Sequence, residues 1–386
     1  MKKRKIQVTV ILLIAAVTLL FSSFGRQLDI EERVLCHAMG VDYEDGEYKV
    51  SLQVFKTQGM GSETPLDVSQ SNIQTVNCSG RTIRDAIESC QYQLGREVFL
   101  GHLQIICFSK NVDFSSPEEL FSFAIKDKNV FLGVELCMAE NTAEELMNVQ
   151  LTRGTMSSEN FTQVIKMGVK NGITVECRLI DLLSCIRSPQ YVAMPVISIK
   201  EPQGDFSDGK KGSAQEEKSA EQQEPLLEIK KTALIKNGTV LEEYLSHADA
   251  SGCQWLTGKA EQYSDIIDYH GSPMDVRITS DGHSLKLDSE NGRLVCRLKL
   301  TVLAHTALDI RDEKSSDEVS ELVERRLEED ITGVWNKAVS ENKTDIFGVW
   351  RLFRHKYPKS YLKYADRLDD VLGSIELKTD ITCRVS

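Results

Sequence analysis

The chain has 386 residues, of which 27% are charged, and its formal net charge is −12. Residues 1–25 carry four cations and no acid, so the rest of the chain is near −16. So acidic a body repels nucleic acid, and we expect no nucleic-acid partner. The length corresponds to two or three domains rather than one.

The first 25 residues predict export. The basic start MKKRK precedes an apolar run with no charged residue from Ile6 to Gly25, which is typical of a signal peptide or a membrane anchor. This segment could be cleaved as a signal peptide or retained as an anchor, and we favour an uncleaved anchor through residues 6–24. A lipoprotein would need a cysteine just after this run, but the first cysteine is Cys36. No lipidation residue is therefore predicted near Gly25.

The ten cysteines of this exported chain could form disulfides. They include no CxxC pair, however, and Cys107, Cys137 and Cys296 lie inside apolar runs typical of strands. Cysteine in such runs behaves as a small buried hydrophobe. We expect mostly buried free thiols, with a disulfide framework as the alternative.

Residues 26–202 predict an N-terminal α+β region, possibly of two subdomains. It opens with a hairpin over 33–55 that turns at Asp45-Gly46, a strong hairpin signal. A polar loop, 56–72, follows. The pattern then predicts alternating strands and helices: strand 72–82, helix 81–95, buried strand 98–110, helix 116–127, strand 129–140, helix 141–149, a loop, helix 177–186 and strand 191–200.

Residues 203–225 hold almost no apolar side chain and predict a flexible linker. Beyond it, residues 226–386 predict a C-terminal α+β domain, giving the chain an α+β fold class with largely antiparallel sheets. Its expected elements are hairpin 226–245 turning at Asn237-Gly238, helix 246–260, strands within 275–305 turning at Asp281-Gly282 and Asn291-Gly292, amphipathic helix 316–339, helices 344–358 and 360–372, and strand 374–386.

The search for chemistry finds no HExxH, GxSxG or P-loop motif. Seven scattered histidines show no metal-ligand spacing: His37, His102, His247, His270, His283, His305 and His355. His102 interrupts a predicted buried strand, and we interpret it as a core histidine bonded to a carbonyl rather than a catalytic base. Glu328, Glu329 and Asp330 are expected on a solvated helix face. We therefore predict no catalytic, cofactor-binding or metal-binding residue, and no cofactor.

Five segments in order resemble the Ger(x)C family, the C subunits of spore germinant receptors. The opening hairpin ERVLCHAMGVDYEDGEYKVSLQV resembles the family's first hairpin, and REVFLGHLQIICFSKNV its following strand. The other three segments are FAIKDKNVFLGVELCMAENTAEELM, KTALIKNGTVLEEYLSHADASGCQWLTGK and TDIFGVWRLFRHKYPKSY. The resemblance covers about 330 residues, nearly the whole chain.

This resemblance implies a non-enzymatic subunit of a nutrient germinant receptor. Family members lie on the outer face of the spore inner membrane and assemble with integral membrane A and B subunits. The resemblance implies three mixed α/β domains and assigns no catalytic residue, cofactor or small-molecule site. The chain departs from the family where Phe24-Gly25-Arg26 stands in place of the lipid-bearing cysteine. The alternatives are an extracytoplasmic solute-binding protein and, less favoured, a secreted hydrolase.

Overall fold

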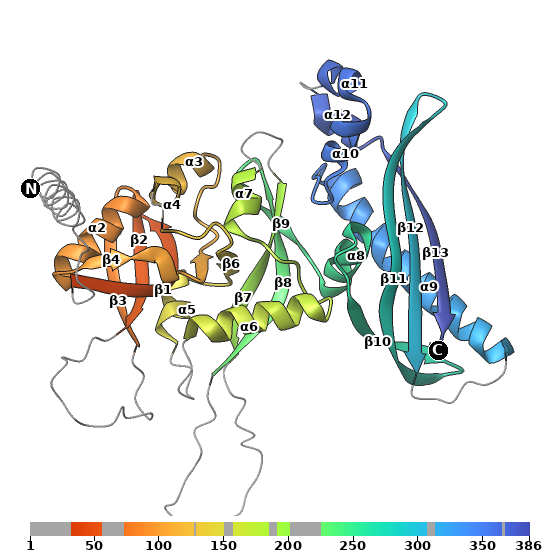
Figure 1. Ribbon diagram of the computed structural model, residues 1–386, viewed down its shortest axis with the longest axis horizontal. Helices are drawn as coiled ribbons and strands as arrows, with labels where there is room; N and C mark the ends of the chain where they lie inside the picture. Colours follow the sequence, from red (N-terminus) through yellow and green to blue (C-terminus); the bar gives the residue numbers. More distant parts are fainter. Residues whose placement is uncertain are drawn as a thin grey trace, which may run out of the picture.

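The computed structural model describes residues 32–55, 73–126, 129–149, 157–184, 191–200, 225–306, 313–364 and 367–386. The predicted anchor 1–25, the loop 56–72 and nearly all of the linker 203–225 lie outside these residues. Within them the chain forms a nine-stranded and a four-stranded sheet with flanking helices (Figure 1), which confirms the α+β fold class.

The nine-stranded sheet has the order β3-β2-β1-β5-β6-β7-β8-β9, with β4 also paired to β1. Neighbours from β1 to β7 along this order are parallel, and the flanking pairs are antiparallel. Its strands are β1 (Arg33–Glu44), β2 (Glu47–Phe55), β3 (Ile73–Gly80), β4 (Glu97–Phe99), β5 (Ile105–Phe108), β6 (Glu135–Ala139), β7 (Tyr191–Lys200), β8 (Leu226–Lys236) and β9 (Thr239–Leu245).

Helices cover both faces of this sheet. Alternate residues of β1 and β5 enter different apolar clusters, since Met39 and Ile106 belong to one and Ala38 and Ile105 to the other. The first cluster includes side chains of α2 (Ile83–Leu94), α3 (Pro117–Leu120), α4 (Ser122–Lys126) and α7 (Leu179–Ser184). The second includes side chains of α5 (Ala143–Asn148) and α6 (Ser157–Lys170). The result is a three-layer arrangement.

The buried strand predicted over 98–110 is wrong in one respect, because it is broken in the middle. β4 pairs with Arg33–Leu35 and β5 with Ala38–Val41, while the 3-10 turn η2 (Leu100–His102) lies between them. β1 itself shifts register between Cys36 and Ala38. Because β1 is irregular there, the residues between β4 and β5 cannot continue the strand pairing, and they form the 3-10 turn instead.

Two further predictions in this half differ from the structure. Residues 157–170 form helix α6, where a loop was expected, and Phe161 and Ile165 bury its apolar face. The helix predicted over 116–127 is divided at Phe121 into α3 and α4. Both elements depend on packing against the sheet, because short helices gain little stability from propensity alone.

The boundary between the two sheets lies later in the chain than the polar segment 203–225, where the composition predicts it. β7 and β8 flank the predicted linker, yet they pair antiparallel in the same sheet from Tyr191↔Lys236 to Lys200↔Leu226. Strands β8 and β9 therefore extend the N-terminal sheet, and α8 (His247–Thr257) leads to the second one. The division into folding units at 203–225 stays a prediction.

The four-stranded sheet has the order β10-β11-β12-β13. Helices α8 and α9 and the following turns pack on one of its faces, with Val319, Val323 and Leu327 buried along α9. This confirms the predicted long amphipathic helix as a core element. The elements are β10 (Gln262–Tyr269), β11 (Ser272–Glu290), β12 (Arg293–Thr306), α9 (Glu313–Trp335), the π-helix η4 (Asn336–Glu341), α10 (Val349–Lys356), α11 (Pro358–Lys363), α12 (Leu368–Leu372) and β13 (Glu376–Val385).

The hairpin turns of this half are made by residues in the left-handed backbone conformation. At Asn237-Gly238 the φ angles are 49° and 83°, and at Asn291-Gly292 they are 49° and 81°. Two-residue hairpin turns require such positive values. The turn predicted at Asp281-Gly282 is wrong, because β11 continues through it with only a register shift between Ser280 and Gly282. The hairpin between β10 and β11 turns instead at His270-Gly271, with φ of 54° and 76°.

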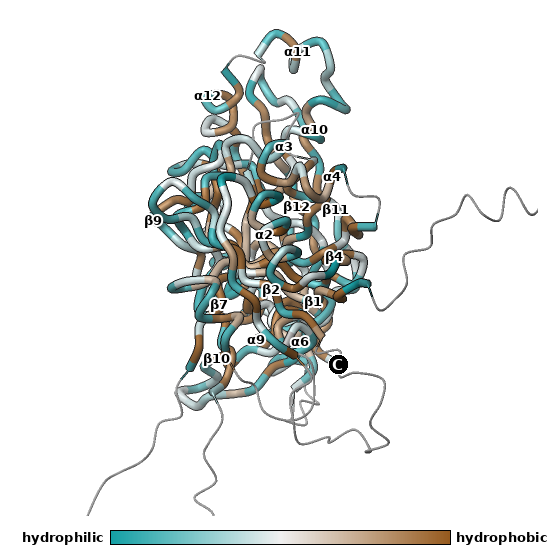
Figure 2. Tube along the Cα trace, turned by 90° about the vertical axis from the view of Figure 1, so that its left-hand side faces the viewer, coloured by the Kyte–Doolittle hydropathy of each residue, from teal (hydrophilic) through white to brown (hydrophobic). Residues whose placement is uncertain are grey.

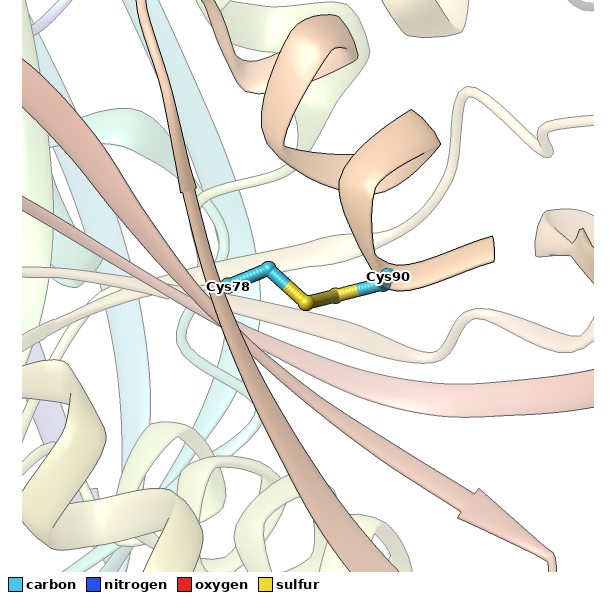
Figure 3. Close-up of a disulfide and its surroundings, with 2 residues drawn as sticks. All are labelled: Cys78 and Cys90. Carbon is cyan, nitrogen blue, oxygen red and sulfur yellow. A yellow bond between two sulfur atoms is a disulfide. The ribbon is translucent and has the colours of Figure 1, made fainter. Parts of the chain in front are cut away.

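The cysteines largely match the expectation of buried free thiols. Seven are free and buried among the described residues: Cys36, Cys107, Cys137, Cys177, Cys253, Cys296 and Cys383. One disulfide joins Cys78 of β3 to Cys90 of α2 (Figure 3). It links the edge strand of the sheet to the helix that follows it.

Candidate interaction surface

The predicted role of His102 is wrong, because the side chain is exposed in η2 rather than buried in a strand. The buried histidine of this region is His37 of β1, which is 5% exposed. Its ring packs edge-on against Phe55 at 4.2 Å between centroids and lies 5.7 Å from the ring of His102. Sequence reasoning missed His37 because its neighbours alternate too weakly to show which face it occupies.

Neither ring nitrogen of His37 has a hydrogen-bond partner among the described residues. Burial, and then the nearby His102, lower the pKa of His37 from 6.5 to about 4. The imidazole is therefore neutral near pH 7 and acts as part of the apolar core.

We expect this histidine to make the fold sensitive to acid. Between its folded pKa of about 4 and its unfolded value of 6.5, the unfolded chain binds a proton that the folded chain does not. The free energy of unfolding then falls as the pH falls through this window. Relative to His37→Leu, wild type should lose up to about 3 kcal/mol between neutral pH and about pH 4, measured by urea unfolding.

The control for this prediction is His355→Leu, which removes an exposed histidine of α10. A difference between wild type and His37→Leu that stays constant with pH would contradict the prediction.

The acidic triplet on α9 is only partly solvated. Glu328 and Glu329 are exposed as predicted, but Asp330 is 6% exposed, which corrects the prediction for that residue. Its carboxylate lies 3.5 Å from Arg326, whose Nε donates to Asp265 of β10 at 3.0 Å. Burial raises the pKa of Asp330 to about 6, with Arg326 opposing the shift. The group holds α9 against β10.

The described residues contain no cluster of three or more His, Cys, Asp or Glu side chains that could hold a metal ion. The histidines that form hydrogen bonds contact the surrounding fold: His247 bonds to the carbonyl of Ile229 at 3.0 Å and His283 to that of Leu256 at 3.0 Å.

A basic surface is formed by α10 and α11. Asp345 stabilises the start of α10. Its carboxylate accepts hydrogen bonds from the backbone N–H groups of Phe347 at 3.2 Å, Val349 at 2.8 Å and Trp350 at 2.7 Å. These bonds satisfy donors that a helix start leaves without partners. Trp350 and Phe353 then point into the core.

The outward side of these helices is basic. Residues 351–364 contain five Lys or Arg residues and no acid, in a chain with a net charge of −12. Side chains on this side are exposed, and Leu362 among them is 74% exposed. We call this the α10–α11 surface: Arg351, Arg354, Lys356, Lys359, Leu362 and Lys363.

A groove of about 380 Å³ lies beside this surface, between α10 and β11. Leu285, Leu287 and Leu352 line it together with the cationic residues Lys286, Arg351 and Lys356 and with His355. The groove therefore joins an apolar floor to a basic rim. The basic rim could have been found in the sequence from the local positive charge of RLFRHKYPKSYLKY. The negative net charge of the whole chain hides this local excess of cations.

No helix among the described residues is long and apolar enough to cross a membrane. The predicted anchor lies outside those residues and stays a prediction.

Two family descriptions match the chain. Residues 26–199 match the spore germination protein N-terminal domain, and residues 230–386 match the C-terminal domain of spore germination proteins of the B3/GerAC-like type. A solved structure titled as that of the GerBC protein resembles the fold with a TM-score of 0.56 and 16% identity, covering 90% of this chain and 96% of that one. None of the curated proteins compared with the chain matches it.

Proposed function

Because the chain belongs to the Ger(x)C family of spore germinant receptor C subunits, we propose that it acts in germination without catalysis, assembled with integral membrane A and B subunits. The observation that carries this proposal is the pair of family matches, which together span 26–199 and 230–386. We place the assembly at the outer face of the spore inner membrane, with the predicted segment 6–24 as its anchor.

An exposed apolar cluster supports assembly with other subunits. Phe131 is 70% exposed and Leu132 39% exposed in the loop before β6, and Ile180 of α7 is 43% exposed. The backbone N–H of Ile180 donates to the carbonyl of Leu132 at 2.9 Å, so the two exposed side chains are neighbours. Exposed apolar side chains that gather in one place are typical of protein–protein contacts.

Deleting the gene should abolish or slow germination with one class of nutrient while growth and sporulation stay normal. The strain used should lack paralogous receptors, and germination should be followed by the fall in optical density of a spore suspension. Complementation with the wild-type gene should restore it. Normal germination with every nutrient tested would contradict the proposal.

The assembly itself is tested by recovery of integral membrane subunits with the tagged chain from detergent-solubilised spore membranes. Phe131→Ser should reduce that recovery because it removes an exposed apolar contact. Ile266→Ser is the matched control, since Ile266 is 64% exposed on the other sheet. Equal loss from both variants, or from neither, would count against the apolar cluster as a subunit contact.

A further inference from the structure

We propose that the α10–α11 surface binds the headgroup region of an anionic phospholipid bilayer, with the neighbouring groove taking part of a lipid molecule. This proposal rests on the proposed function in one respect only, which is that the protein must lie beside a membrane. The contact is separate from the predicted N-terminal anchor and involves the opposite end of the chain.

The first argument is the charge left unpaired on this surface. Arg351, Arg354, Lys359 and Lys363 are exposed, and none forms an ion pair with another described residue. Three acids among the described residues nearby have cations of their own: Asp288 pairs with Lys356 at 2.5 Å, Asp369 with Lys236 at 3.2 Å and Asp370 with Lys343 at 3.8 Å. A basic surface on an acidic protein is complementary to an anionic partner.

The second argument is the mixture of charge and apolar contact. Leu362 is 74% exposed among these cations, and the groove has three leucines beneath a basic rim. A lipid presents the same two chemistries in the same order, with an anionic headgroup above acyl chains. Surfaces of Lys and Arg with a few large apolar side chains bind at the membrane interface.

The third argument is position. α11 and α12 lie at one end of the molecule in both views (Figures 1 and 2), and the β11–β12 hairpin ends beside them in Figure 1. A flat membrane surface can therefore reach α11 together with the tip of this hairpin, while most of the acidic body lies further away.

The tyrosines separate this surface from one that binds nucleic acid. Single strands bind to aromatic rings that are open for base stacking. Here Tyr357 and Tyr361 pack inward against Phe353, with ring centroids 6.2 Å and 5.9 Å apart. The rings hold α11 to the core, and the large side chains left exposed on α11 are the cations Lys359 and Lys363 and the apolar Leu362.

The experiment uses the full chain reconstituted with vesicles of phosphatidylcholine alone or with about 30% phosphatidylglycerol, the fraction expected to give a negative surface potential. Amide hydrogen exchange is followed for peptides covering residues 349–364. We expect exchange to slow severalfold with the anionic vesicles at low salt only, since surface charges are screened within about 10 Å at 0.1 M salt.

The test variant is Arg354→Gln with Lys359→Gln and Lys363→Gln. Each cation near an anionic surface contributes about a fivefold change in binding, so docking should weaken about a hundredfold and the slowing of exchange should disappear. The matched control is Lys170→Gln with Lys299→Gln and Lys314→Gln, which removes equal charge from exposed positions elsewhere. It should behave as wild type.

Equal slowing with neutral and anionic vesicles, or full slowing in the test variant, would overturn the proposal. So would slowing that requires an added acidic protein or an oligonucleotide instead of lipid. These outcomes are distinct from failure of the germination assignment, because vesicle binding and spore germination are measured separately. A thermal melt that matches wild type shows that both variants fold.

Discussion

Gly252→Ala is expected to lower the free energy of unfolding by about 2–3 kcal/mol, although alanine is the better helix former. Gly252 lies in α8 where this helix crosses α9. A Cβ atom there would lie 2.3 Å from the carbonyl oxygen of Asp330 and 2.6 Å from its carbon. Because these are backbone atoms, the two helices would have to separate. Urea unfolding followed by circular dichroism measures the effect.

The matched control for this prediction is Gly333→Ala, one turn further along α9. Gly333 is exposed, and a Cβ atom would meet nothing within 4 Å. It should therefore gain about 0.5–1 kcal/mol from helix propensity alone. Opposite signs for the two variants would establish the close approach of α8 and α9, whereas a stabilised Gly252→Ala would show that the helices lie further apart.

Gly238→Ala should cost about 3–4 kcal/mol, the sum of two separate penalties. Gly238 has a φ of +83°, where a side chain is strained. A Cβ atom would also lie 2.1 Å from the backbone nitrogen of Ser115. Its carbonyl accepts from the N–H of Phe114 at 3.0 Å, so the β8–β9 turn supports the loop before α3. The variant would detach the two segments.

Gly292→Ala separates the two penalties. Gly292 follows an asparagine in the same kind of turn, with a φ of +81°, but a Cβ atom there would meet nothing within 4 Å. Only the backbone strain of about 1–2 kcal/mol should remain. If both variants lost the same stability in urea unfolding, the contact with Ser115 would contribute nothing.

The family assignment needed no coordinates. It came from five segments in a fixed order, and both family matches agree with it. Local rules also placed most elements correctly. Asp45-Gly46 and Asn237-Gly238 form the expected turns because few residues adopt a positive φ. α9 begins and ends near the predicted bounds because its apolar stripe repeats at the helical period.

Tertiary structure decided what depends on residues distant in the chain. β7 and β8 pair across the predicted linker, and η2 forms where β1 shifts register. The same holds for individual side chains. Asp330 looked solvated beside Glu328 and Glu329, yet it is buried beside Arg326, which bonds to Asp265 of β10, and His37 rather than His102 is the buried histidine. Local patterns specify turns and helix faces. Burial, strand order and the exposed basic surface follow from which distant elements meet, because packing rather than propensity sets them.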